Sequence, residues 1–176
     1  MAIEPVIEAA VLLANGRVPN NPLPALIYRQ AIDTQSADDS AARIEQVFAR
    51  NGWLNSWTNG IYPFHHYHSI SHEVLGIAIG RVYVRLGGDQ GQDFTLDEGD
   101  IVVLPAGVGH KRLSASRDLL VVGAYPDGRD WDLIRADDTG TADYEAARSR
   151  IAAVPLPEAD PVFGAQGPLL QKWRTR

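Results

Sequence analysis

The segment GIYPFHHYHSISHEVLGIAIG, residues 60–80, contains four of the five histidines of the chain: His65, His66, His68 and His72, followed directly by Glu73. Side chains alternate between the two faces of a β-strand, so His66 and His68 project to the same side. Two imidazoles on one face, together with a carboxylate from a neighbouring strand, are three parts of a metal site with nitrogen and oxygen ligands. The segment therefore predicts a metal site that residues from elsewhere in the chain complete.

The fifth histidine, His110, lies in a second patterned segment, GDIVVLPAGVGHKRLS, residues 99–114. Arg112 and Ser114 follow His110 at intervals of two, so all three share one face if the strand stays regular. We interpret the rest of the chain as a barrel that brings the two segments together.

Two residues compete for the third ligand position of the first segment. Gly80-Arg81 lies between two apolar runs and predicts a two-residue hairpin turn, which sets Glu73 opposite Gly88. Glu73 then faces the interior, with no opposing side chain to fill the space of an ion. His72 faces the other way on the same strand and is the alternative to Glu73.

Composition narrows the class of protein. A chain of 176 residues with 45% hydrophobic content suits one domain, and the absence of cysteine excludes disulfides and thiolate metal sites. The formal charge of −6 and the pI near 5.3 argue against nucleic acid as a partner. Neither a secretory signal nor a membrane span is recognisable, so we expect a cytoplasmic protein by default.

We expect a single domain over residues 1–176 with three parts. Residues 1–52 form an N-terminal arm and helix: a short start compatible with a helix, a Pro- and Asn-rich connection, and a helix capped near Asp39 with an apolar stripe at Ile44, Val47 and Phe48. Residues 53–125 form the barrel core, with short strands at about ten-residue spacing. Residues 126–176 form a C-terminal loop, a helix near Ala142–Ala152 and a strap that lies on the barrel. Asp130, Trp131 and Asp132 are predicted to be surface packing.

Both segments resemble known motifs. The spacing Gly60-x5-His66-x-His68-x4-Glu73-x6-Gly80 is similar to the first motif of the cupin superfamily, and Gly99-x5-Pro105-x-Gly107-x2-His110 is similar to the second. Ser114 stands where many cupins have Asn. More narrowly, HHYHSISHEVLGIAIG, LPAGVGHK and VVGAYPDGRDWD resemble the small single-domain bacterial cupins of the YjlB type. The resemblance implies an all-β double-stranded β-helix, an RmlC-like jelly-roll barrel with short peripheral helices at both ends, and pairing as a homodimer.

The resemblance also implies one divalent transition metal ion held by His66, His68, Glu73 and His110, with His72 as the alternative to Glu73. Three imidazoles and one carboxylate suit Fe, Mn, Ni, Co, Cu or Zn and leave positions open on an octahedral ion. Arg112, Tyr62 and Phe64 share the inward parity and are the candidate substrate-binding residues, with Arg112 suited to an anionic small molecule.

Two functions are compatible with this pattern. The first is a metal-dependent enzyme, a dioxygenase-like oxidoreductase or an isomerase, acting on a small organic molecule. The alternative is a non-catalytic small-molecule or sugar-binding or regulatory cupin with a structural metal or none. Few acid–base groups besides the ligands are available, which favours chemistry by the metal itself, or no chemistry, over isomerisation.

Overall fold

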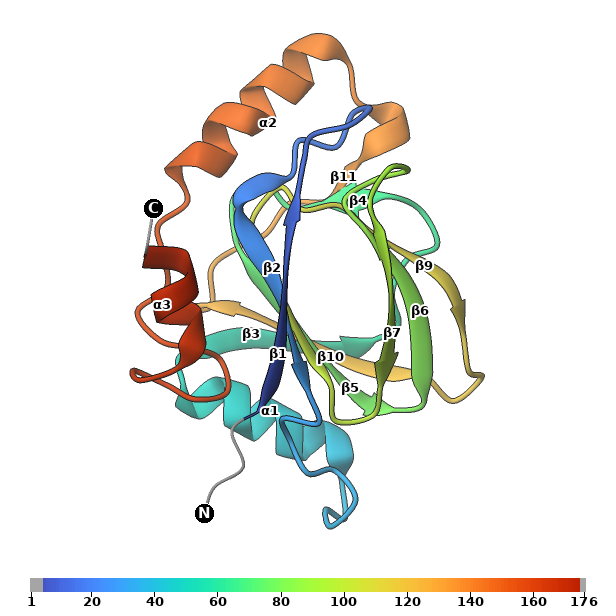
Figure 1. The fold of residues 1–176 in the computed structure, drawn as a ribbon, viewed down its shortest axis with the longest axis vertical. Coiled ribbons are helices and arrows are strands. Elements are labelled where there is room, and N and C mark those ends of the chain that lie inside the picture. Colours follow the sequence, from blue (N-terminus) through green and yellow to red (C-terminus); the bar gives the residue numbers. More distant parts are fainter. Residues whose placement is uncertain (1–4, 175–176) are drawn as a thin grey trace.

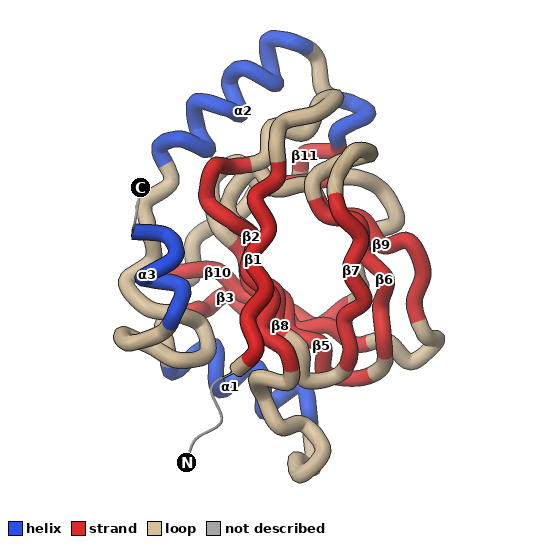
Figure 2. Tube along the Cα trace, viewed as in Figure 1, coloured by secondary structure: helices blue, strands red, loops and turns tan. Residues whose placement is uncertain are grey.

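A computed structural model describes residues 5–174 and consists of two antiparallel sheets that face each other, with helices around them (Figures 1 and 2). The six-stranded sheet has the spatial order β1 (Val6–Leu12), β2 (Asn21–Arg29), β8 (Ile101–Leu104), β5 (Glu73–Ile79), β10 (Leu120–Pro126), β3 (Trp53–Asn59). The five-stranded sheet has the order β11 (Ile134–Arg135), β4 (His66–Tyr67), β9 (His110–Ala115), β6 (Arg81–Leu86), β7 (Gln92–Asp97). The helices are α1 (Ser40–Arg50), α2 (Thr141–Ala153), α3 (Pro168–Arg174) and the 3-10 turn η1 (Ala136–Asp138). The predicted all-β jelly-roll arrangement with peripheral helices is confirmed.

One apolar core fills the space between the two sheets. Leu75 and Ile77 of β5 point into it and meet Val82, Val84 and other residues of the five-stranded sheet. Glu73 has the same parity as Leu75 and Ile77, so the strand that builds this core also carries a carboxylate into it. The site described below therefore lies at one end of the inter-sheet core.

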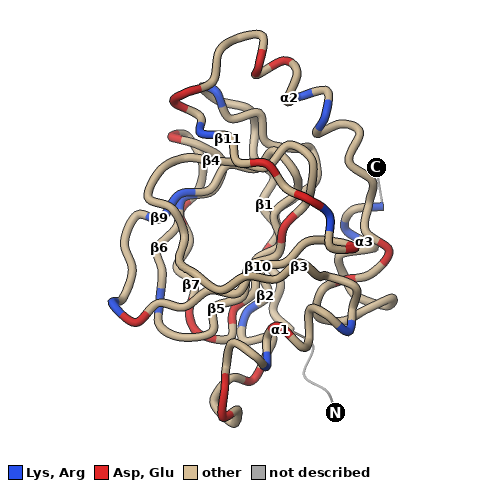
Figure 3. Tube along the Cα trace, turned by 180° about the vertical axis from the view of Figure 1, so that it is seen from behind, with Lys and Arg blue, Asp and Glu red and all other residues tan. Residues whose placement is uncertain are grey.

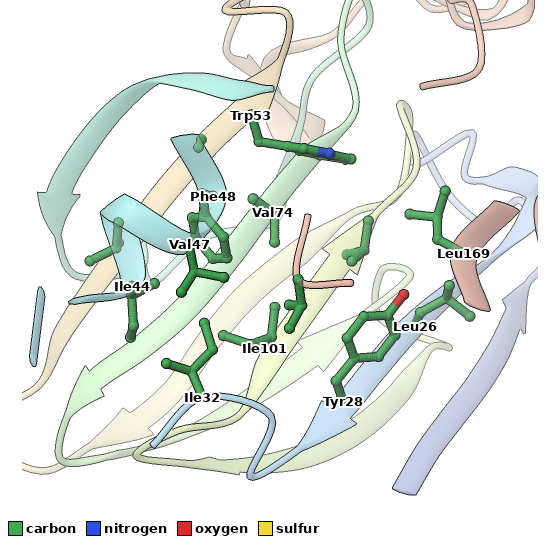
Figure 4. Packing of buried hydrophobic residues seen from close by; sticks show 14 of the residues in the cluster. Leu26, Tyr28, Ile32, Ile44, Val47, Phe48, Trp53, Val74, Ile101 and Leu169 are labelled. Atoms are coloured by element: carbon green, nitrogen blue, oxygen red, sulfur yellow. The ribbon is translucent and has the colours of Figure 1, made fainter. Parts of the chain in front are cut away.

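A second core covers the outer face of the six-stranded sheet, as Figure 4 shows. The predicted stripe of α1, Ile44, Val47 and Phe48, is buried there, and the Asp39 carboxylate caps the helix by accepting from the Ala42 N–H. Gly76 allows this close approach, because a Cβ atom on it would stand 2.7 Å from Ile44 Cγ2. Burial of each of these large side chains contributes roughly 1.5–3 kcal/mol.

The C-terminal strap packs on the same outer face, as predicted, but it includes the helix α3. Leu169, Leu170 and Trp173 of α3 are buried in the second core. Asp160 fixes the approach to α3: its carboxylate accepts from the Tyr28 hydroxyl at 2.6 Å and from backbone N–H groups that include Leu169 at 3.1 Å. The segment that leads into α3 is thus tied to β2.

Two local predictions are wrong. Residues 6–12 and 21–24 form strands β1 and part of β2 instead of a helical start and an irregular connection, so the six-stranded sheet begins within the expected N-terminal arm and not at Trp53. β5 and β6 do not form a hairpin either: β5 pairs with β8 and β10, whereas β6 pairs with β7 and β9. The turn at Gly80, with φ at 86°, instead carries the chain from one sheet to the other.

Charged residues of both signs are interspersed along the outer segments of the described chain (Figure 3). Between residues 5 and 174, none of the helices has the length and apolar character that a membrane crossing requires.

Candidate metal centre

The two sheets bring four candidate ligands together at one end of the inter-sheet core. His66 on β4 and His110 at the start of β9 are directly opposite each other in the antiparallel pair, and His68 lies just beyond β4. Glu73 comes from the other sheet, at the first position of β5. All four side chains are buried, with exposed fractions between 2% and 6%.

The three imidazoles form a compact group. Their ligand nitrogens all lie within 4.8 Å of one another. The Glu73 carboxylate contacts two of them: its Oε2 lies 3.0 Å from Nε2 of His68 and 3.4 Å from Nε2 of His110. The arrangement therefore offers three nitrogens and one oxygen around one small volume.

Backbone carbonyls fix the tautomer of each imidazole. The Nδ1 atoms of His66, His68 and His110 lie in hydrogen-bond contact with the carbonyl oxygens of Phe64 (3.0 Å), Asp132 and Val108 (3.1 Å), respectively. A carbonyl oxygen only accepts, so each Nδ1 carries the proton and donates it. Each neutral ring then presents an Nε2 lone pair, as metal-ligating histidines with an ordered outer partner do.

Burial and neighbouring charges shift the pKa values of His66 and His68 in opposite directions. Burial, followed by the nearby His110, lowers the pKa of His66 to about 2. Burial acts in the same direction on His68, but the Glu73 carboxylate outweighs it and raises the pKa of His68 above its ordinary value. The pKa of Glu73 is lowered despite burial, because His68 and His110 favour the ionised carboxylate. Glu73 is thus a carboxylate at neutral pH.

The donor set fits a transition metal ion. When the imidazoles are neutral, Oε2 of Glu73 is buried without a hydrogen-bond donor among the described residues, because the Nε2 atoms that face it carry lone pairs. The raised pKa of His68 reflects the same conflict, which a proton on Nε2 relieves. A buried anionic oxygen without a donor is costly, and neutral imidazole lone pairs beside it do not relieve that cost. A divalent cation satisfies the oxygen and the nitrogen lone pairs at once, and the mixed nitrogen and oxygen set matches borderline metals better than Ca²⁺ or Mg²⁺.

The alternative ligand, His72, lies on the other side of the sheet. Its Nδ1 accepts from the Ala106 N–H at 2.9 Å, and its ring packs 4.9 Å from the ring of Trp173. Burial lowers its pKa to about 4. Parity therefore separated His72 from Glu73 correctly, although the hairpin used to argue the register does not exist.

A cavity of about 450 Å³ opens beside the four residues. Tyr62 and Arg112 line it, as predicted from parity, whereas Phe64 is not among its lining residues. Phe64 instead stacks on Tyr62 at 4.9 Å, with the Arg135 guanidinium 3.9 Å above its ring. Phe64 is therefore not part of the cavity wall, and its role in substrate binding stays a prediction.

Arg112 is the one Lys or Arg among the lining residues of this cavity. It is half-buried, and its Nη1 lies 4.0 Å from the place that a Cβ atom on Gly60 would take. None of the ion pairs among residues 5–174 includes Arg112. The cavity is therefore lined both by the buried Glu73 carboxylate and by a guanidinium that has no ion-pair partner among these residues.

Sequence reasoning missed the loop that follows β10. The Asp132 carbonyl orients His68, and the Asp132 carboxylate accepts from the Ser69 N–H at 2.7 Å and from its hydroxyl. Trp131 lines the cavity and stacks on Tyr125 with ring centroids 6.0 Å apart. The prediction that this loop is only surface packing is wrong, and no local pattern indicated its contacts.

Comparison with known proteins gives one strong match. No family model matches the chain. It is 43% identical over 163 residues to the uncharacterised protein YjlB of Bacillus subtilis (strain 168), which covers 90% of this chain and 92% of that protein.

Solved structures give weaker likenesses. The chain is similar to acireductone dioxygenase from Bacillus anthracis with a cadmium ion in its active centre (20% identity, 53% of this chain and 62% of that chain, TM-score 0.38). It is also similar to a DUF861 family protein from Thermotoga maritima (19% identity, 52% of this chain and 93% of that chain, TM-score 0.32). A third similar structure is the epimerase RmlC from Legionella pneumophila (12% identity, 71% of this chain and 74% of that chain, TM-score 0.38). Likenesses this distant transfer neither a ligand nor a reaction to this chain.

Proposed function

The chain belongs to the YjlB family of cupins, and from that premise we propose that it binds a divalent transition metal through His66, His68, Glu73 and His110 and acts on a small organic anion. The observation that carries the proposal is the convergence of carbonyl-oriented imidazoles on a buried carboxylate oxygen that has no hydrogen-bond donor when these imidazoles are neutral. A bound Fe, Mn, Ni, Co, Cu or Zn ion supplies a Lewis acid with positions left for substrate, and the redox-active members of this set also supply electron transfer.

Arg112 supports an anionic substrate. Its guanidinium is unpaired among the described residues and lines the same cavity as the four ligands. A planar guanidinium binds a carboxylate through two parallel hydrogen bonds. One carboxylate-bearing molecule in a cavity of about 450 Å³ therefore reaches both Arg112 and the ligand cluster.

Oxidation dependent on O₂ is the reaction class that these residues favour over isomerisation. An isomerase needs a base or acid within hydrogen-bond reach of the substrate. Apart from the ligands, the ionisable side chains that line the cavity are Tyr62, Arg112 and Tyr125. Arg112 does not deprotonate, and the Tyr125 hydroxyl already donates to Glu73. Isomerisation is left with Tyr62 alone as its proton-transfer group.

Metal analysis and ligand binding test the proposal. Protein purified without chelator should contain a transition metal, and His66→Ala and His110→Ala should lose it. Small carboxylates should raise the melting temperature of the wild type. Arg112→Lys should weaken that effect without changing the metal content, because Lys keeps the positive charge but cannot donate two parallel hydrogen bonds to a carboxylate.

Three results count against the proposal. If both histidine variants retain the metal, the ligand assignment is wrong. If Arg112→Lys and Arg112→Ala bind every tested carboxylate as the wild type does, or no carboxylate binds at all, the anionic substrate is wrong. Turnover of a bound carboxylate at equal rates with and without O₂ would remove the oxidase assignment.

A further inference from the structure

Glu73 has a second oxygen, and the structure gives it a different environment from the first. Oε2 faces the histidines, as described above. Oε1 accepts a hydrogen bond of 3.2 Å from the hydroxyl of Tyr125, which comes from β10, the strand next to β5. The two oxygens of one carboxylate are therefore divided between a phenol and the histidine cluster.

The Tyr125 hydroxyl is itself held in place. It accepts a hydrogen bond of 2.9 Å from the indole N–H of Trp57 on β3. Because its acceptor role is taken by Trp57, the phenol proton is directed to Glu73. Indole, phenol and carboxylate thus form a chain of hydrogen bonds with a single direction.

Gly123 makes room for this chain. Gly123 and Trp57 are cross-strand partners between β10 and β3, and the indole lies over the glycine. A Cβ atom on Gly123 would stand 2.2 Å from two carbons of the indole and 2.6 Å from its nitrogen. Any side chain at position 123 therefore displaces the Trp57 donor.

We propose that Tyr125 is a positioning residue of the metal centre: it holds Oε1 of Glu73, with Trp57 and Gly123 fixing the phenol, so that Glu73 presents Oε2 alone to the ion. The inference rests on the proposed metal site. A carboxylate that binds through one oxygen leaves an additional coordination position free for substrate, compared with one that binds through both. The Trp57–Tyr125 pair thus determines how many coordination positions of the ion stay free for substrate.

Cobalt titration tests the proposal, because Co²⁺ suits a nitrogen and oxygen site and its visible absorption reports both binding and coordination. Tyr125→Phe should bind Co²⁺ about 10- to 100-fold more weakly, as loss of an outer-shell partner typically does, with an altered spectrum. Trp57→Phe and Gly123→Ala should weaken binding in the same direction and by less. The double variant Trp57→Phe/Tyr125→Phe should be no weaker than Tyr125→Phe, because Trp57 acts through the hydroxyl.

Tyr28→Phe is the matched control. It also removes a buried phenol that donates to a carboxylate, Asp160, at 2.6 Å, but Tyr28 belongs to the core on the outer face of the six-stranded sheet and does not line the metal-site cavity. It should lower the melting temperature of the metal-free protein and leave the affinity and spectrum of Co²⁺ unchanged. A general loss of stability therefore does not imitate the expected result.

Each outcome decides the proposal. Wild-type affinity in Tyr125→Phe, or full additivity in the double variant, overturns it while leaving the metal site intact. If Tyr125→Phe fails to fold, Trp57→Phe and Gly123→Ala carry the test, and wild-type affinity in both overturns the proposal. A wild-type protein that binds no Co²⁺ overturns this proposal, and metal analysis then decides separately whether the proposed function stands.

Discussion

Replacing Glu73 by Gln should abolish most of the stabilisation that a metal ion gives to this protein. Glu73 supplies the one anionic group in the ligand set, because the three imidazoles are neutral when they ligate. Gln has nearly the same shape but no charge. The change therefore tests the charge of Glu73 with little change in packing.

The magnitude follows from mass action. With free metal at about 100 times the dissociation constant, the wild type gains about 2.7 kcal/mol of folding stability. Loss of an outer-shell partner alone weakens metal binding by about 10- to 100-fold, so we take about 100-fold as the lower bound for loss of the carboxylate itself. At the same metal concentration the variant then gains only about 0.4 kcal/mol. For a chain of this size, these gains correspond to rises in melting temperature of roughly 5–11 °C and roughly 1–2 °C.

Thermal unfolding with and without metal measures the difference. The quantity to compare is the rise in melting temperature on adding metal, because the metal-free baselines of the variants will differ. His72→Gln is the control: it disturbs the buried hydrogen bond to Ala106 and lowers the baseline, but the metal-dependent rise should match the wild type. The reasoning is refuted if Glu73→Gln shows the full metal-dependent rise in melting temperature and His72→Gln shows none. In that case His72, and not Glu73, is the metal ligand.

Three further predictions concern pH, chelation and the C-terminal strap. A proton competes with the metal for Nε2 of His68, whose pKa is raised above the ordinary value of a histidine, so metal affinity should increase as the pH rises until this group is deprotonated and then level off; cobalt titrations that show the opposite trend would contradict this. Removal of metal by a chelator should leave the strand signal in circular dichroism intact at room temperature, because both apolar cores form without the ion, and its loss would show that the metal is needed for folding. Asp160→Asn should destabilise the protein by at least ~2 kcal/mol, since the Tyr28 hydroxyl and the Leu169 N–H lose a carboxylate acceptor; denaturation at wild-type midpoint would count against this role.

Local sequence determined the elements whose signals are local. The i, i+3, i+4 stripe of α1 and its Asp39 cap predicted the helix and its buried face. Strand parity predicted that Glu73 faces inward and His72 outward, because alternation is a property of the strand alone and does not depend on its partner. The motif spacing brought His66, His68 and His110 to one candidate site, and the structure places them together.

Long-range pairing decided what local signals left ambiguous. Gly80 permits a turn, but whether β6 folds back on β5 or crosses to the other sheet depends on which strands pair with each, and those partners are distant in sequence. Only the first part of the strand at residues 21–29 was obscured, by its prolines at positions 22 and 24; pairing with β8 involves only Leu26, Ile27 and Tyr28, so the prolines do not interrupt that ladder.

The outer partners of the metal centre could be found only in the tertiary structure. Tyr125 lies 52 residues from Glu73, and Asp132 lies 64 residues from His68, so no periodicity links them. Their roles depend on the side-by-side pairing of β5 and β10 and on the return of the β10–β11 loop over β4. Alternation along a strand determines which face a ligand takes, whereas the folding of the whole chain determines which groups orient it.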